Sequence, residues 1–138
     1  MEQIKFNTPY ALVLPRKKGK DKRISINLNT YRNLHFQINN QCKRLYKELM
    51  REQLEGLTID TPVEVTYQVF KPTRRSLDKM NVVSIASKYF LDAVTEYGCW
   101  EDDNDENIKT EIILPTQIDR DNPRIEITIK SIKDVYNK

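Results

Sequence analysis

The chain has 138 residues, of which 38% are hydrophobic and 31% charged, and its formal net charge is +3. This balance is typical of a globular protein rather than a disordered chain, and the length suits a single domain over residues 1–138. No apolar run approaches the roughly 18 residues that a membrane span needs, and the N-terminal residues lack the apolar core of a signal peptide. The sequence therefore predicts a cytoplasmic protein without a membrane span.

The charge is unevenly distributed along the chain. Residues 1–75 contain 15 Lys and Arg against 7 Asp and Glu, a net charge of +8. Residues 76–138 contain 8 Lys and Arg against 13 Asp and Glu, a net charge of −5. The basic half predicts a polyanionic partner. The carboxylates of the acidic half require a separate explanation.

The first half of the chain predicts a hairpin, a helix and a strand. YALVLP (10–15) and RISINL (23–28) are short strand-like runs joined by the basic loop RKKGKDKR (16–23). A helix capped by Asn29 or Thr30 is expected to run to about Glu55. TPVEVTYQVF (61–70) alternates between faces and is rich in β-branched residues, which indicates a strand.

The second half predicts one helix and two strands. The helix runs from about Lys79 to Tyr97 and stops at Gly98, and IKTEIIL (108–114) and RIEITIK (124–130) are the strands. The expected order is ββ-α-β-α-ββ. This order predicts an α+β domain with two helices packed on a mixed or antiparallel sheet.

The second helix has one apolar stripe and one polar side. Apolar residues recur at i, i+3, i+4 and i+7, so they predict a buried face. The polar side includes Asn81, Ser84, Lys88 and Asp92. Taken alone, Lys88 and Asp92 predict a surface ion pair at i, i+4.

Aspartates stand at both ends of this helix. Asp78 precedes it, and Asp102 and Asp103 follow it within the acidic segment CWEDDNDE (99–106). A straight helix of this length separates its ends by about 30 Å, so the carboxylates meet only under one of two conditions. Either residues 79–84 are not helical, or the acidic segment folds back along the helix. We favour the first condition, with the helix beginning near Ser84.

Carboxylates in a basic surface favour a magnesium site. Mg²⁺ is held by a few carboxylates beside substrate phosphates, and it can activate water for phosphodiester hydrolysis. A solvated acidic loop is the simpler interpretation of the same residues. An EF-hand calcium loop starting at Asp103 is excluded, because Ile108 stands where that loop needs Gly and Leu114 stands where it needs Glu.

Three stretches resemble the RusA family of Holliday-junction resolvases, which is common in phages and prophages. They are TPVEV (61–65), KPTRRSLD (71–78) and the ungapped run from Lys88 to Asp103 with its D-A-V, Gly, Trp and Asp-Asp elements. The resemblance implies a homodimeric Mg²⁺-dependent endonuclease, with Mn²⁺ as a substitute, that nicks branched DNA at four-way junctions. It also implies that the protein is located in a bacterial host cell. It implies no membrane partner and no small-molecule cofactor.

The resemblance also assigns roles to single residues. The family's catalytic lysine falls on Lys88, and its acidic residue after the helix falls on Asp103, with Asp102 beside it. Its aspartate before the helix falls on Asp78, and Asp92 matches the aspartate of its Asp-Ala-Leu element. The implied catalytic residues are Asp78, Lys88 and Asp103, and the implied metal ligands are Asp78, Asp92, Asp102 and Asp103.

Two departures from the family pattern bear on this assignment. Ser76 replaces the first carboxylate of the family's D-x-D motif, and Asp78 lies ten residues before Lys88 where better-known members have four. An alternative alignment puts Ser84 at the aspartate position, but a hydroxyl cannot replace a charged ligand. With Asp78 preferred, Asn81 becomes an additional candidate for phosphate or metal contact.

The basic segments supply candidate DNA contacts. Arg74 and Arg75 are expected to flank the site and clamp a phosphate. The loop cations are expected to hold a DNA arm through sequence-independent, salt-sensitive contacts. They are Arg16, Lys17, Lys18, Lys20, Lys22 and Arg23. Two other hypotheses remain open: an inactive branched-DNA-binding protein of the same fold, and a structural phage protein.

Overall fold

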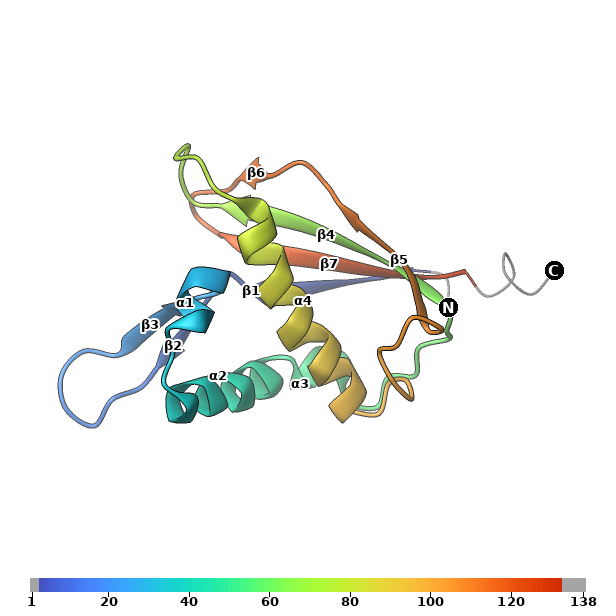
Figure 1. Cartoon of the computed structure of the whole chain (residues 1–138), viewed down its shortest axis with the longest axis horizontal. Helices are drawn as coiled ribbons and strands as arrows, with labels where there is room; N and C mark the ends of the chain where they lie inside the picture. The colour runs from blue at the N-terminus through green and yellow to red at the C-terminus, as the bar shows by residue number, and fades with distance from the viewer. Residues whose placement is uncertain (1–2, 133–138) are drawn as a thin grey trace.

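The computed structural model, which describes residues 3–132, shows a sheet with helices packed on one face (Figure 1). Strand β1 spans Gln3–Pro9, and β2 (Ala11–Leu14) and β3 (Lys22–Ser25) form a separate hairpin. Helices α1 (Leu28–Arg32), α2 (Phe36–Leu49) and α3 (Arg51–Leu54) follow. The chain continues through β4 (Val63–Lys71), α4 (Lys79–Glu96), β5 (Ile108–Ile113), β6 (Gln117–Ile118) and β7 (Arg124–Ser131). The predicted α+β class is confirmed.

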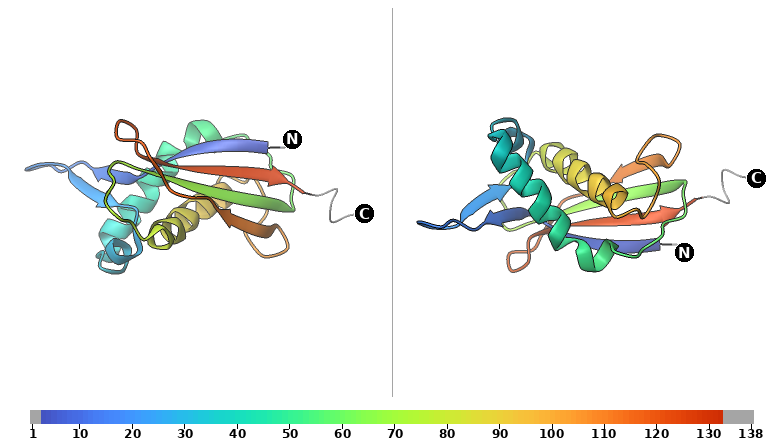
Figure 2. Two further views of the ribbon diagram at one scale, coloured as in Figure 1. Left: turned by 90° about the horizontal axis from the view of Figure 1, so that it is seen from above. Right: turned by 90° about the horizontal axis from the view of Figure 1, so that it is seen from below.

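The main sheet is mixed, with the order β1-β7-β4-β5 and β6 paired to the end of β4. β7 pairs antiparallel with both β1 and β4, whereas β5 and β6 run parallel to β4. Helices α2 and α4 lie over one face, and the other face is open (Figure 2). Because side chains alternate along a strand, Val63, Val65, Tyr67 and Val69 of β4 all point into the covered face and are buried.

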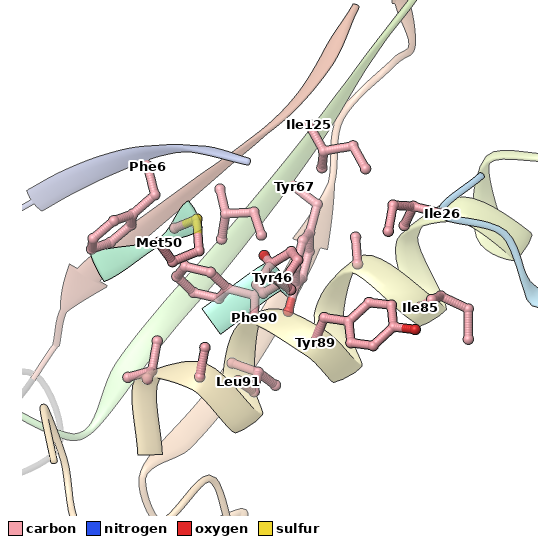
Figure 3. Packing of buried hydrophobic residues seen from close by; sticks show 14 of the residues in the cluster. Phe6, Ile26, Tyr46, Met50, Tyr67, Ile85, Tyr89, Phe90, Leu91 and Ile125 are labelled. Carbon is pink, nitrogen blue, oxygen red and sulfur yellow. The ribbon is translucent and has the colours of Figure 1, made fainter. Parts of the chain in front are cut away.

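The core fills the space between the sheet and the two long helices (Figure 3). The Phe6 ring of β1 packs on Phe90 of α4 with centroids 5.2 Å apart, and Tyr46 of α2 stacks on Tyr89 at 5.4 Å. The isoleucines of β7 that face these rings are completely covered. Burial of this apolar surface is the main favourable term in folding.

Strand β1 is an edge strand, and a side chain protects part of its free edge. The Gln53 amide accepts a hydrogen bond from Asn7 N at 3.0 Å and donates one to Asn7 O at 2.8 Å. The amide therefore imitates the backbone of a neighbouring strand. Such a cover reduces pairing with other chains at an exposed edge.

The prediction of one helix from Asn29 or Thr30 to Glu55 is wrong, because polar side chains divide this segment. Asn27 caps α1 by accepting from Asn29 N at 2.8 Å, and α1 ends after one turn. His35 then caps α2, with its Nδ1 accepting from Gln37 N at 3.2 Å. Strand β1 and the short β6 were also missed, although the β2–β3 hairpin, β4, β5 and β7 were predicted.

The expectation that residues 78–84 form a loop is wrong as well. Helix α4 begins at Lys79, and the Asp78 carboxylate caps it by accepting from Met80 N at 3.2 Å. The buried stripe already starts at Val82 and Val83, so packing holds the first turns in the helix. Gly98 ends the helix with a φ of 73°. Within residues 3–132 no helix is long and apolar enough to cross a membrane.

A hydrogen-bonded group joins α4 to the edge strand β5. The Tyr67 hydroxyl of β4 donates to Glu111 Oε2 of β5 at 2.6 Å, and Ser87 Oγ of α4 lies 2.9 Å from the same hydroxyl. Burial, together with the carboxylate that accepts its proton, raises the pKa of Tyr67. This group therefore ties the strand that follows the acidic segment to the body of the domain.

Tyr67→Phe is expected to lower the free energy of unfolding by about 1–3 kcal/mol, because it removes a hydrogen bond to a charged acceptor. Urea unfolding followed by circular dichroism measures the change. Tyr31→Phe is the control, since no hydrogen bond to the Tyr31 hydroxyl is present in the described part of the chain. Equal stability of Tyr67→Phe and the wild type would contradict this role.

Candidate functional site

The acidic turn, residues 101–106, begins on a buried anchor. Cys99 and Trp100 are only 2% and 6% exposed, although they stand directly before six solvent-exposed residues. Trp100 Nε1 donates to Thr95 Oγ1 of α4 at 2.8 Å, and Ile59 N donates to Cys99 O at 2.8 Å. These contacts bury Trp100 and fix the start of the acidic turn.

The other end of the acidic turn is tied to the sheet. Asn104 Oδ1 accepts from the backbone N–H groups of Glu106 and Asn107, each at 3.1 Å. Val63 N of β4 donates to Asn107 O at 2.7 Å, and the Asn107 amide donates to Asp102 O at 2.7 Å. The turn is therefore held at both ends by backbone and amide hydrogen bonds.

Three carboxylates interact at this turn. Asp102 Oδ1 accepts from Asp103 N at 2.8 Å. Partial burial raises the pKa of Asp103, and the hydrogen bond with the Asp102 carboxyl and the charges of Asp102 and Asp92 raise it further. The structure thus brings together three of the four predicted metal ligands, one from the end of α4 and two from the acidic turn.

Asp92 also faces α2 across a narrow groove. The groove is lined by Lys43 and Lys47 of α2 and by Tyr89, Asp92 and Glu96 of α4, among others. Lys47 Nζ is engaged by Glu96 at 3.1 Å, whereas no ion pair holds Lys43 within the described residues. Neither lysine was predicted to belong to the site, because the sequence does not give the angle at which α2 crosses α4.

Asp78 lies at the opposite end of α4 from the acidic turn. Fourteen residues of helix separate it from Asp92, which corresponds to about 21 Å. Figure 1 shows the acidic turn beyond the C-terminal end of α4, so it does not fold back toward Asp78. The expectation that Asp78 shares a metal site with Asp103 therefore fails on geometry.

Three other predicted site residues, Arg74, Arg75 and Asn81, accompany Asp78 at that far end, together with Ser76. Arg74, Arg75 and Ser76 are exposed in the loop before α4, and Lys71 Nζ donates to Arg75 O at 3.0 Å. Asn81 follows in the first turn, where its backbone N–H donates to Asp78 O. The arginines thus flank Asp78 and do not flank the three carboxylates.

Lys88 occupies the exposed side of α4, one turn before Asp92. Its Nζ lies 5.9 Å from the centre of the Tyr31 ring of α1. No ion pair between Lys88 and Asp92 is present in residues 3–132, so the surface pair expected from their spacing is not formed. The lysine is directed toward α1, and Lys43 is the cation that faces Asp92 in the α2–α4 groove.

The donor chemistry of the three carboxylates fits Mg²⁺, with one restriction. Over residues 3–132, no three His, Cys, Asp or Glu side chains form a group that could hold a metal ion as they stand. Mg²⁺ keeps several waters and needs only one or two carboxylates beside a substrate phosphate. Asp102 and Asp103 would supply those direct ligands, and the charge of Asp92 acts on Asp103 from the end of α4.

A scan against models of protein families finds no match to the chain, and a search of curated proteins finds no similar sequence.

Asp103→Asn is expected to raise the melting temperature at pH 7 in EDTA. The raised pKa means that the folded state binds the Asp103 proton more tightly than the unfolded chain does. This carboxyl therefore favours folding below its ordinary pKa of 3.8, and that contribution is lost as the pH rises through the raised value. The increase in melting temperature caused by the substitution should therefore become smaller toward about pH 3.

Thermal unfolding from pH 3 to pH 8 or so, with EDTA and with Mg²⁺, measures this effect. Asp105→Asn is the matched control, because it removes one charge from the same turn. Mg²⁺ should stabilise the wild type and the control but not Asp103→Asn. A lower melting temperature for Asp103→Asn in EDTA at pH 7 would contradict the repulsion described above.

Proposed function

We propose that the protein is a Mg²⁺-dependent endonuclease that nicks branched DNA and resolves four-way junctions. The observation that carries this proposal is the interaction of Asp102 and Asp103, on an anchored turn, with Asp92 of α4, which shares a groove with Lys43. Carboxylates at close range repel one another unless a cation or a proton separates them. The resemblance of residues 88–103 to RusA-type resolvases supports the same chemistry.

In this proposal, the carboxylates would bind the metal and the lysines would contact the phosphate. Asp102 and Asp103 would hold the metal, whose chemistry when bound would be to activate a water and to neutralise charge on the phosphate. Asp92 would add negative charge beside these two ligands. Lys43 lines the groove that contains Asp92, and Lys43 and Lys88 would stabilise the negative charge that develops on the scissile phosphate.

The two-fold symmetry of a four-way junction suits a homodimeric enzyme. A four-way junction has approximate two-fold symmetry, and its resolution requires two nicks on related strands. A homodimer with two-fold symmetry presents one acidic turn to each strand. The proposed partners are thus branched DNA and a second copy of the chain, in a bacterial host cell.

An inactive DNA-binding protein of the same fold is the second candidate. Two observations favour it: Ser76 stands where the family has a carboxylate, and Asp78 is used as the cap of α4 about 21 Å from Asp92. A site with only the three carboxylates of the acidic end is sparser than the family pattern. Cleavage assays separate the two candidates.

A synthetic four-way junction should be nicked in Mg²⁺ or Mn²⁺ and remain intact in EDTA. Asp103→Asn should lower the nicking rate at least about 100-fold, because it removes a direct metal ligand. The same substitution should leave junction affinity equal or higher, since it removes a negative charge near phosphate. Asp105→Asn should keep near wild-type activity.

Three results would decide against this function. Nicking by Asp103→Asn at the wild-type rate would contradict the site. Binding to junctions without cleavage in either metal would favour the inactive DNA-binding protein. Cleavage of linear duplex as fast as of the junction would contradict the selectivity for branched DNA.

A further inference from the structure

The β2–β3 hairpin combines a fixed base with a projecting basic loop. Leu12, Leu14, Ile24 and Ile26 at its base are at most 6% exposed and belong to the core. The loop over residues 16–23 extends away from the body at one end of the molecule, where the views of Figures 1 and 2 agree. The hairpin is therefore a small arm anchored to the domain.

The positive charge of this loop is not neutralised by ion pairs with the described part of the chain. Six of its eight residues are Lys or Arg, and none of them forms an ion pair within the part of the chain that the structure describes. The single carboxylate, Asp21, instead accepts a hydrogen bond from Arg16 N at 3.4 Å and closes the loop. A concentration of unpaired cations raises the free energy of the isolated fold and is relieved by a polyanion.

Further unpaired cations continue from the arm toward the acidic turn. Arg44 of α2 lines a hollow with Leu14 and Pro15 at the base of the arm, and Lys43 lies in the groove that contains Asp92. Both side chains are exposed, and neither forms an ion pair in the described residues. Two adjacent residues of α2 thus place unpaired positive charge between the base of the arm and the groove that contains Asp92.

The distance between the arm and the acidic turn determines how long a bound DNA branch must be to reach both. The arm and the acidic turn lie at opposite ends of the long axis, and strand β4 runs along that axis between them (Figure 1). The nine residues of β4 span about 30 Å. Phosphates along one strand of B-DNA are about 3.4 Å apart, so this span corresponds to at least about nine base pairs.

We propose that the β2–β3 hairpin is a DNA-binding arm that grips a duplex branch at least about nine base pairs from the phosphate held at the acidic turn. The position of the cleaved phosphate rests on the proposed function, whereas the binding itself does not. The arm sets a minimum branch length for tight binding. A duplex is the favoured ligand over a membrane surface, because residues 16–23 contain no apolar side chain that could enter the lipid interface.

Equilibrium binding in EDTA tests the arm without chemistry. The probes are fluorescent four-way junctions whose hairpin-closed arms have about 5 or about 12 base pairs, on either side of the span of about nine base pairs. The variant carries Lys17→Gln, Lys18→Gln and Lys20→Gln. The control carries Lys5→Gln, Arg120→Gln and Lys130→Gln, which remove the same charge from exposed sites outside the arm and α2.

The wild type and the control should prefer the long arms by tenfold or so, and the arm variant should bind long and short arms equally. The salt dependence of log K should become shallower by about 0.9 for each phosphate that the arm variant no longer neutralises. These changes should appear even if the protein nicks nothing, so failure of the proposed function leaves this test intact.

Two outcomes would overturn the proposal. The first is equal arm-length preference in the arm variant and the wild type. The second is an equal reduction of affinity in the arm variant and the control, which would show a general charge effect. As a separate check, tighter arm-dependent binding to phosphatidylserine vesicles than to the junctions would also overturn it, in favour of a membrane partner.

Discussion

The packing of α4 against the sheet is the constraint on which the rest of the structure depends. Nine side chains of this helix are buried, from Val82 to Val94, and they meet the inward-facing residues of β4 and β7. This packing keeps the helix regular from its first turn, with Asp78 as its cap. The helix leads directly to Gly98 and the buried Trp100. The acidic turn therefore lies at the C-terminal end of α4, opposite Asp78.

A consequence is that the residues predicted to form one site fall into two groups. Asp78, Arg74 and Arg75 stand at one end of α4, and Asp92, Asp102 and Asp103 stand at the other. The second group has mutually interacting carboxylates and a cation from another helix, so it is the better candidate for chemistry. Its repulsion opposes folding at neutral pH, which is a common cost of a functional site. Bound metal would offset that cost.

Much of the fold was predictable from the sequence, because it depends on local patterns. Alternation identified β4 and β7, and the apolar stripe of α4 with Gly98 at its end identified that helix. The division of the first helix was missed, since a capping Asn27 or His35 looks like any polar residue until the backbone conformation is known. Strand β1 was missed because its mixed sequence is stabilised by pairing with β7, more than 100 residues away.

The site was predictable only in part for a similar reason. Asp102 and Asp103 are adjacent in sequence, and Asp92 lies one turn before the end of α4, so their association follows from local geometry. Lys43 reaches the site through the packing of α2 on α4, which no sequence spacing encodes. Asp78 was assigned to the site by the resemblance, and it could reach the other carboxylates only if the first turns of α4 were not helical. The buried Val82 and Val83 explain why these turns are helical.

Paramagnetic broadening by Mn²⁺ in the NMR spectrum of the apo protein tests the central claim, that the carboxylates at the acidic end of α4 form the metal site. At substoichiometric Mn²⁺, the amide signals of Asp92, Asp102 and Asp103 should broaden first. The signals of Asp78 and of the loop over residues 16–23 should remain sharp. Broadening that centres on Asp78, or that spreads evenly over all exposed carboxylates, would contradict the account.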